Sequence, residues 1–260
     1  MRKIGVNLHA MPGLSDEAYV KTMVEQGFSA VFTGPCHYIE NAALFAKNGL
    51  AYETVHAPFR GINDIWLPGE AGEEMYRQLA DCVDGCAAAA VPHMVVHLSS
   101  GLTPPPTTDV GRGRFTDLVN YAAKKNVRIA FENQRMLANL AWAFEEFGPD
   151  VAGFCWDCGH EACFTPGRAY MPLFGNRVEC LHIHDNFKVF NEDKHLIPFD
   201  GAVDFDRVAA QLKTSGFAGT IMLEIITKNS PGFYDGLTVE EYLQKAAHAA
   251  RRLAALVDEA

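Results

Sequence analysis

The amino-acid sequence predicts a single (β/α)8 TIM barrel. Short apolar segments alternate with longer amphipathic segments along the chain, and eight such strand–helix pairs fit into 260 residues. Strands that alternate with helices imply parallel strand pairing, and a closed eight-stranded barrel needs about 250 residues. An open doubly wound sheet usually carries a glycine-rich phosphate loop after its first strand, which residues 7–13 lack. We therefore expect residues 1–260 to form one barrel domain.

The first half of the chain supplies four predicted strands, each a short apolar run. They cover residues 4–9, 30–34, 52–56 and 93–99. Helices are predicted for residues 15–26, 38–47 and 72–90. Ser15 opens the first helix, and Gly27 and Gly49 end the first two, because glycine readily adopts the conformation that follows a helix. Pro58 ends the third strand, and Pro92 precedes the fourth.

The second half repeats the pattern. Strands are predicted for residues 128–133, 151–157, 178–185 and 219–225. Helices are predicted for residues 109–125, 136–147, 205–215 and 238–259, with a weaker helix after the sixth strand. The fifth helix ends at Gly148-Pro149, and a long loop over residues 186–201 follows the seventh strand. Thr238 and Glu241 are spaced as a capping box, which marks the start of the last helix.

Charge and cysteine content narrow the class of protein. The chain has 22 basic and 32 acidic residues, so its net charge is −10. This argues against a nucleic-acid partner, because such proteins neutralise phosphates with Lys and Arg. We see no signal-peptide pattern and no run of about 18 apolar residues for a membrane span. Seven cysteines, an odd number, indicate reduced thiols and a cytoplasmic location.

Ionisable side chains end six consecutive predicted strands. They are His56, His97, Glu132, Asp157, His184 and Glu224. Catalytic residues of (β/α)8 barrels lie at the carboxyl ends of the strands, and a buried carboxylate is costly unless it is paired or bound to metal. Mixed carboxylate and imidazole ligands suit Mn²⁺, Zn²⁺, Co²⁺ or Mg²⁺. The sequence therefore predicts a divalent metal site at this rim.

The residue two positions before each of these should face the lumen one layer deeper. On the last five strands these residues are Val95, Ala130, Cys155, His182 and Met222. Their mostly small or apolar side chains fit a packed barrel floor. Taken singly, each polar residue has a structural explanation: Glu132 could pair with Arg128 or Arg135, and Asp157 could cap the next turn. Six such residues in succession are better explained by a common site.

The ordered motifs resemble the xylose-isomerase-like barrel superfamily, which includes sugar isomerases and epimerases, inosose dehydratase and AP endonucleases of the endonuclease IV type. The motifs are His-Ala-Pro at 56–58, Val-Val-His at 95–97, Phe-Glu-Asn at 131–133, Trp-Asp-x-Gly-His at 156–160, His-Ile-His-Asp-Asn at 182–186 and Leu-Glu at 223–224. The loop over residues 193–205 is similar to the family's loop after strand seven, with Phe199 where glycine is usual. Together the motifs span nearly the whole chain.

The resemblance implies particular roles for these residues. In the sugar-isomerase branch, Glu132, Asp157, His184 and Glu224 would hold one metal ion, Mn²⁺ foremost, with Zn²⁺, Co²⁺ or Mg²⁺ as alternatives. His160 would lie beside the substrate's oxygens. The extra ligand positions of the endonuclease branch, which builds a trinuclear zinc site, are matched by His56, His97, Asp193 and His195. His160 is a further candidate ligand, so the metal count stays open.

The expected function is that of a metal-dependent isomerase or epimerase acting on a small sugar, polyol or keto compound. Glu132 and Glu224 would act as base and acid through an enediolate, and His160 would hydrogen-bond the developing oxyanion. Substrate-contacting candidates are His56, His97, His195 and Trp66. We see no phosphate cradle after strands seven and eight, which favours a free sugar.

Three alternatives remain open at the level of sequence. An inositol-type dehydratase would use similar parts. An AP endonuclease would use all nine ligand-like residues, although the negative net charge opposes it. A non-catalytic binding barrel would not need intact acids and bases. A homo-oligomer is also open, with Trp66 and Phe233-Tyr234 as contacts between subunits or as a cap over the site.

Overall fold

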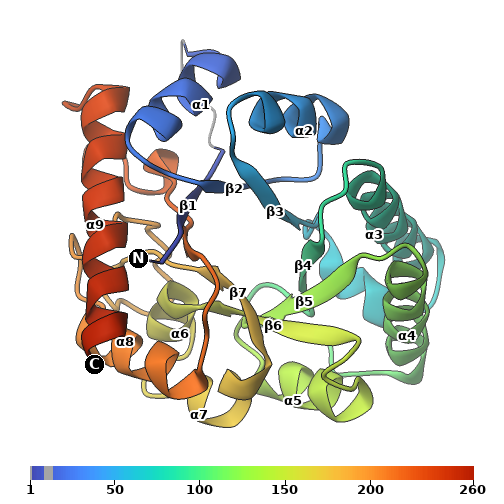
Figure 1. Ribbon diagram of the computed structural model, residues 1–260. Helices are drawn as coiled ribbons and strands as arrows, with labels where there is room; N and C mark the ends of the chain where they lie inside the picture. The colour runs from blue at the N-terminus through green and yellow to red at the C-terminus, as the bar shows by residue number, and fades with distance from the viewer. Residues whose placement is uncertain (1, 9–13) are drawn as a thin grey trace.

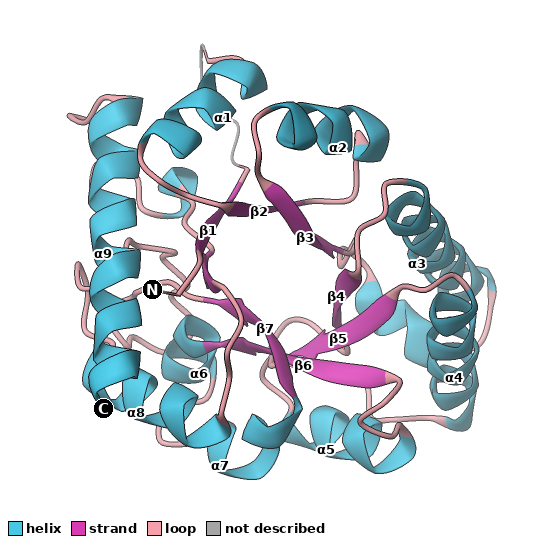
Figure 2. Cartoon of the chain, viewed as in Figure 1, coloured by secondary structure: helices cyan, strands magenta, loops and turns pink. Residues whose placement is uncertain are grey.

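The chain forms a ring of eight strands, which helices surround (Figures 1 and 2). The computed structural model describes residues 2–8 and 14–260. The strands are β1 (Ile4–Asn7), β2 (Ala30–Thr33), β3 (Ala51–His56), β4 (His93–His97), β5 (Arg128–Glu132), β6 (Ala152–Asp157), β7 (Val178–His182) and β8 (Ile221–Leu223). The α-helices are α1 (Asp16–Glu25), α2 (Tyr38–Lys47), α3 (Glu70–Ala88), α4 (Asp109–Lys124), α5 (Leu137–Glu146), α6 (Cys158–Phe164), α7 (Met171–Phe174), α8 (Phe205–Ser215) and α9 (Val239–Glu259). Short 3-10 helices are η1 (Ile62–Trp66), η2 (Gly175–Arg177) and η3 (Thr227–Asn229).

Hydrogen bonds close the strands into a barrel. The order of neighbours is β7-β6-β5-β4-β3-β2-β1-β8, and every ladder is parallel. β7 and β8 meet through a parallel bridge between Ile183 and Leu223. Here the Ile183 N–H donates to the Met222 carbonyl at 2.9 Å, and the Glu224 N–H donates to the Ile183 carbonyl at 3.0 Å. The predicted (β/α)8 barrel is therefore confirmed, and all strands end at one rim.

Most strands are shorter than predicted, and three of these differences bear on the rim. β1 ends at Asn7, and the rest of the predicted first strand runs into residues 9–13, which lie outside the described part of the chain. β7 ends at His182 and β8 covers only three residues. Beyond them the chain makes only isolated bridges, such as the antiparallel bridge from Asp185 to Leu196. His184 and Glu224 therefore follow their strands instead of lying within them.

A small apolar layer fills the floor of the barrel. It consists of Val95, Ala130, Cys155 and Cys180, which form a buried cluster separate from the core between strands and helices. Three of these residues were predicted to lie there. The fourth was not, because the predicted floor residue on the seventh strand is His182. In the structure Cys180 pairs with Cys155 and His182 pairs with Asp157, so His182 lies one layer above the floor.

The helix α9 begins with the predicted capping box. The Thr238 hydroxyl accepts a hydrogen bond from the Glu241 N–H at 3.2 Å, and the Glu241 carboxylate accepts one from the Thr238 N–H at 2.8 Å. These bonds satisfy N–H groups that a helix start otherwise leaves unpaired. α9 buries its apolar face beside α8 and α1. Within the described residues, no helix combines the length and apolar character needed to span a bilayer.

Candidate metal centre

Glu132 is the hub of the polar cluster at the rim. Its side chain is buried at the end of β5. Its Oε2 lies 2.8 Å from His97 Nε2 and 3.2 Å from His56 Nε2. Its Oε1 lies 3.1 Å from His160 Nδ1 and 3.3 Å from His182 Nδ1. Four imidazoles, from β3, β4, β7 and α6, therefore contact one carboxylate.

Four side chains around this hub bring ligand atoms together. This carboxylate quartet consists of Glu132, Asp157, His182 and Glu224, whose ligand atoms lie within 4.8 Å of one another. His182 Nδ1 lies 3.3 Å from Glu132 Oε1 and 3.4 Å from Glu224 Oε2. All four residues are buried, and they come from β5, β6, β7 and the residue just after β8. Three carboxylates and one imidazole form a donor set that suits a divalent cation.

Of the four predicted metal ligands, Glu132, Asp157 and Glu224 belong to this quartet, and His184 lies beside it. The side chains of His182 and His184 both face the lumen, because they are two residues apart. His182 is level with Asp157 in the β6–β7 ladder, whereas His184 lies beyond the end of β7. His184 still touches the quartet, with Nε2 3.0 Å from Asp157 Oδ1. The sequence placed His182 in the barrel floor, one layer too deep.

A second group lies on the outer side of Asp157. This imidazole group consists of His160, His184, Asp193 and His195. Asp193 Oδ2 lies 3.2 Å from His160 Nε2 and 2.9 Å from His195 Nε2. The rings of His184 and His195 stack with centroids 4.0 Å apart. A third, overlapping group joins His56 to Glu132 and His182. The rim therefore gathers the residues that the resemblance named as extra ligand positions.

Burial and neighbouring charges shift the pKa values at this rim in opposite directions. Burial disfavours the imidazolium form of His182, but the carboxylates of Glu224 and Glu132 outweigh it and raise the pKa of His182 to about 9. Burial also opposes charge on His195, and Asp193 and Glu224 raise the pKa of His195 to about 9. Burial raises the pKa of Glu132, yet its histidine neighbours hold it well below the usual range.

Amide side chains that the sequence did not single out hold the rim in place. Asn133 donates to the Asp157 carbonyl and accepts from the Asp157 N–H, each at 2.8 Å. Asn7 makes the same pair of bonds with the backbone of Ile225, beside Glu224. The Gln134 amide nitrogen lies 3.1 Å from both His97 Nε2 and His160 Nδ1. Asn133 belongs to the Phe-Glu-Asn motif, but nothing in the sequence assigns it this role.

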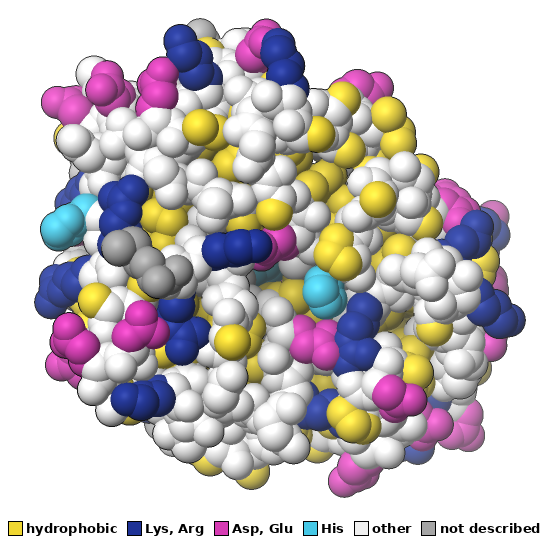
Figure 3. Space-filling view, in the orientation of Figure 1, with side chains coloured by type: hydrophobic (Ala, Val, Ile, Leu, Met, Phe, Trp, Pro, Cys, Tyr) yellow, Lys and Arg dark blue, Asp and Glu magenta, His cyan; other side chains and the backbone are white. Residues whose placement is uncertain are grey.

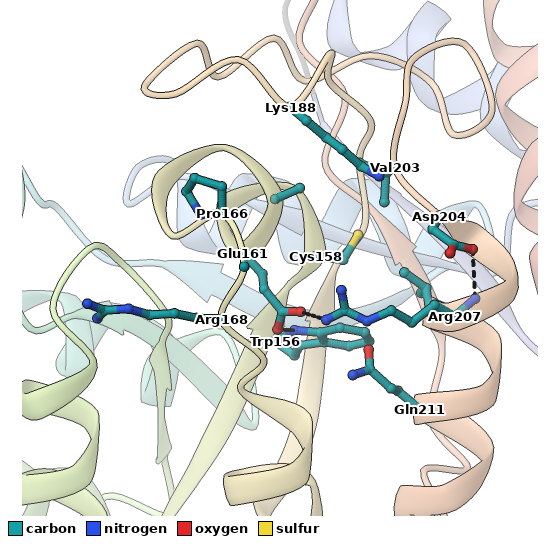
Figure 4. A pocket seen from close by; sticks show the side chains of 13 residues that line it. Trp156, Cys158, Glu161, Pro166, Arg168, Lys188, Val203, Asp204, Arg207 and Gln211 are labelled. Carbon is teal, nitrogen blue, oxygen red and sulfur yellow. Dashed lines mark hydrogen bonds and ion pairs between the residues drawn. The ribbon is translucent and has the colours of Figure 1, made fainter.

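Helix α6, which carries His160, is fixed on its outer side by Glu161 (Figure 4). The Trp156 indole N–H and the Tyr170 backbone N–H each donate to Glu161 Oε2 at 3.0 Å. Arg207, on α8, forms an ion pair with Glu161 Oε1. On the inner side, the Asp157 carboxylate accepts from the His160 N–H at 2.6 Å. The position of His160 is thus set by contacts on both sides of the helix.

Gly159 leaves room for His184. A Cβ atom at position 159 would overlap the His184 ring, so we expect Gly159→Ala to displace that ring and to lower the free energy of unfolding by about 1–3 kcal/mol. Gly113→Ala, at an exposed position of helix α4 with open space around it, should instead be neutral or raise stability by up to about 1 kcal/mol. Chemical denaturation measures both, and equal stabilities for the two variants would contradict the packing described.

A cavity of about 770 Å³ opens above the metal centre. This lies within the range of about 300–1,000 Å³ typical of small-molecule sites. Among the residues predicted to contact substrate, His56, His97 and His195 line it, as do His160 and Glu224. The cavity is therefore large enough for a small sugar above the quartet.

Trp66 does not line this cavity, and its predicted position over the mouth is wrong. Residues 62–66 form η1, which turns the indole inward, so Trp66 is fully buried. Its N–H donates to the Leu98 carbonyl at 2.7 Å, and its ring packs 5.0 Å from that of Phe115. Tyr234 is also buried, with its hydroxyl donating to Asp200 at 2.8 Å. Of the three aromatic residues proposed as subunit contacts, only Phe233 is exposed.

The sequence pattern of one protein family covers most of the chain. The xylose isomerase-like TIM barrel family matches residues 35–256. The chain belongs to this family. One relative is the uncharacterized protein y4fM of Sinorhizobium fredii (strain NBRC 101917 / NGR234). The two sequences are 26% identical over an alignment of 254 residues, and the match covers 82% of this chain and 77% of that protein.

Solved structures support the same fold. A xylose isomerase domain protein from Alicyclobacillus acidocaldarius has a TM-score of 0.75 at 17% identity, covering 99% of this chain and 100% of that one. The D-psicose 3-epimerase from Clostridium cellulolyticum H10, solved with D-tagatose, has a TM-score of 0.78 at 13% identity, covering 98% and 99%. At these identities the likeness establishes the fold of the xylose isomerase-like chain, and its chemistry has to be argued from its own residues.

The residues of the xylose isomerase-like chain fit a divalent cation. His56 Nε2 and His97 Nε2 lie 3.1 Å apart while both face Glu132 Oε2, an arrangement in which a shared cation would satisfy several lone pairs at once. Further buried polar atoms lack a hydrogen-bond partner among the described residues: His97 Nδ1, His182 Nε2, His184 Nδ1 and Asp193 Oδ1. Buried polar atoms without partners are rare in folded proteins. The three histidine atoms are the ring nitrogens opposite those that contact the carboxylates, whereas Asp193 Oδ1 faces His184 Nε2 at 3.7 Å, so Asp193 Oδ1 is the one that a metal ion at the rim would satisfy.

Metal binding should strengthen as pH rises. A metal ion needs the neutral imidazole of His182, whose pKa in the metal-free protein is raised to about 9, so binding must displace a proton below that pH. We expect the affinity for Mn²⁺ to rise by up to about tenfold per pH unit between about pH 7 and about pH 9. Calorimetry in buffers of different ionisation enthalpy measures the released proton. A pH-independent affinity over this interval would contradict the protonation described.

Proposed function

We propose that this chain is a metal-dependent isomerase or epimerase of a small sugar or sugar-like polyol or keto compound. The observation that supports this most directly is the pair of glutamates, Glu132 and Glu224, on either side of His182. Glu224 lines the cavity of about 770 Å³, and Glu132 lies behind His56, His97 and His160, which also line it. The two glutamates come from β5 and from the end of β8, which β6 and β7 separate. Substrate in the cavity would therefore meet the Glu224 carboxylate directly, and the proposal requires it to reach Glu132 between the histidines that line the cavity.

The proposed reaction is a proton transfer at a carbon next to a carbonyl group. One glutamate takes the proton, which leaves the electron pair in an enediolate, and a glutamate returns a proton either to the neighbouring carbon or to the other face of the same carbon. The first outcome is isomerisation and the second is epimerisation. His160, held by the Asp157 cap and packed against Phe164 with ring centroids 4.5 Å apart, would donate a hydrogen bond to the developing oxyanion.

Glu132, Asp157, His182 and Glu224 would hold the metal ion in this scheme. A bound divalent cation supplies positive charge that stabilises the oxyanion as it forms. The three carboxylates of the quartet favour a hard cation, and we propose Mn²⁺, with Mg²⁺ or Co²⁺ as substitutes. The imidazole group, with three imidazoles and one carboxylate, would favour Zn²⁺ if it binds metal.

The nuclease alternative draws its support from that imidazole group. The electrostatics oppose it, because the net charge of −10 repels a polyanion. On the face seen in Figure 3, Lys and Arg side chains of the described residues are interspersed with Asp and Glu side chains. An extended basic surface that could track a phosphate backbone is therefore not present on that face. The isomerase or epimerase function is the better supported of the two.

Deuterium incorporation tests the proposed chemistry even while the product is unidentified. The Mn²⁺-loaded protein is incubated in D2O with a panel of ketoses, and NMR follows exchange of the hydrogen beside the carbonyl group. We expect exchange with at least one ketose, together with a new stereoisomer or a positional isomer. Nicking of abasic DNA that chelation abolishes, with no exchange on any ketose, would refute the proposal. Loss of water from the substrate would instead indicate a dehydratase.

A further inference from the structure

The rim of the cavity carries positive charge that the metal centre does not account for. Three cationic side chains line the cavity: Arg60 after β3, Arg135 after β5 and Lys228 after β8. They come from separate loops, so no contiguous motif marks them in the sequence. Among the described residues, none of the three has a carboxylate within ion-pair distance. In a chain with a net charge of −10, three unpaired cations around one opening call for a functional explanation.

The acids deeper in the cavity do not need these cations. Each of the four carboxylates at the metal centre already has a histidine nitrogen nearby. The distances are 2.8 Å for Glu132, 3.0 Å for Asp157, 2.9 Å for Asp193 and 3.4 Å for Glu224. A bound metal ion would neutralise them further. The rim cations are therefore free to attract charge that arrives with a ligand.

Arg135 is held in place by contacts with Phe164 and Asn191. Its guanidinium lies 3.5 Å from the centre of the Phe164 ring, and Phe164 in turn stacks on His160. Its Nε donates to the Asn191 side-chain oxygen at 3.1 Å, and the Asn191 N–H donates to the Cys163 carbonyl at 2.9 Å. The guanidinium is thus held over the same ring stack that ends at His160. Its Nη1 makes no hydrogen bond among the described residues, which leaves a donor for a ligand.

We infer that the substrate carries an anionic group, a carboxylate or a phosphate, at the end away from the metal centre, and that Arg135 binds it. This inference rests on the proposed function, because it places the reacting carbons at the quartet. Arg135 would be a specificity-determining residue, with Arg60 and Lys228 adding to the attractive field at the mouth. A planar guanidinium with fixed orientation suits either anion. The sequence shows no phosphate-binding motif because these three cations follow three different strands.

Binding of unreactive polyols tests the inference separately from catalysis. Calorimetry on the Mn²⁺-loaded protein compares glucitol, glucitol with a terminal phosphate, and gluconate. We expect at least one of the anions to bind about tenfold or more tightly than glucitol, and the tighter of the two to identify the anionic group. Arg135→Gln should remove most of that preference while leaving glucitol binding unchanged. Arg135→Lys should keep part of it, because the charge remains.

Arg168→Gln is the matched control. It removes the same charge from an exposed arginine that does not line this cavity, and it should keep the full preference for the anion. The inference is overturned if neither anion binds more tightly than glucitol, or if Arg135→Gln and Arg168→Gln behave alike. Since the probes do not react, a preference without ketose turnover would refute only the proposed function, and turnover of neutral ketoses without the preference would refute only this inference.

Discussion

Replacing Glu132 with Gln should lower kcat/KM by about 1,000-fold or more and leave the fold intact. Gln has the same shape and can still accept hydrogen bonds from the surrounding imidazoles. It cannot act as a base at neutral pH, and it removes a negative charge from the hub that four histidines contact. General-base catalysis alone contributes about 100- to 10,000-fold. Steady-state kinetics with circular dichroism on the same sample measures both parts of the prediction.

Glu179→Gln is the matched control for this experiment. Glu179 lies near the start of β7, at the opposite end of the barrel, where it forms an ion pair with Arg128. Its replacement should change kcat/KM by no more than about twofold, because a partly exposed pair far from the rim contributes little. Near-full turnover of Glu132→Gln, with this control also active, would remove Glu132 from the mechanism.

Replacing His182 with Asn should lower the affinity for Mn²⁺ by at least about 100-fold and stop turnover. His182 is the one imidazole of the carboxylate quartet, and even residues that only support a metal ligand typically contribute about 10- to 100-fold to affinity. In the metal-free protein, this replacement also removes the imidazolium of His182 from between the carboxylates of Glu132 and Glu224. Calorimetric titration with Mn²⁺ gives the affinity directly.

His184→Asn separates the two histidines at the end of the seventh strand. His184 contacts Asp157 from outside the quartet, so its replacement should reduce Mn²⁺ affinity by no more than about tenfold. If His184→Asn lost the metal while His182→Asn retained it, His184 would be the metal ligand, as the sequence predicts, and His182 would not.

The fold could be predicted because its signals are local and repeat. Each strand is a short apolar run, each helix has end signals such as the pair Thr238 and Glu241, and eight units in 260 residues leave few architectures. Strand length could not be predicted as well. β7 stops where the chain around Asp185 turns to pair with Leu196. β8 stops just before Ile225, whose backbone groups bond to the side chain of Asn7. Both contacts depend on tertiary structure.

The sequence predicts which kinds of residue meet at the rim, but it does not show which of the two histidines at the end of the seventh strand lies level with which carboxylate. Glu132, Asp157 and Glu224 converge as expected, since parallel strands end at one rim. His182 and His184 have the same facing. The β6–β7 ladder pairs His182 with Asp157, whereas the bridge between Ile183 and Leu223 puts His184 level with Glu224, so which histidine holds the metal stays a prediction. Trp66 was misplaced for a related reason, because the turn of η1 that buries its indole has no clear sequence signal.

The position of a bound Mn²⁺ ion would show whether the carboxylate quartet is the metal site. Crystals soaked in Mn²⁺ and measured at a wavelength where manganese scatters anomalously would show where the ion lies. We predict a peak with Glu132, Asp157, His182 and Glu224 each at a ligand distance of about 2.0–2.3 Å. A peak elsewhere on the protein, or a saturating soak that leaves these four residues without an ion, would mean that the quartet is not the metal site.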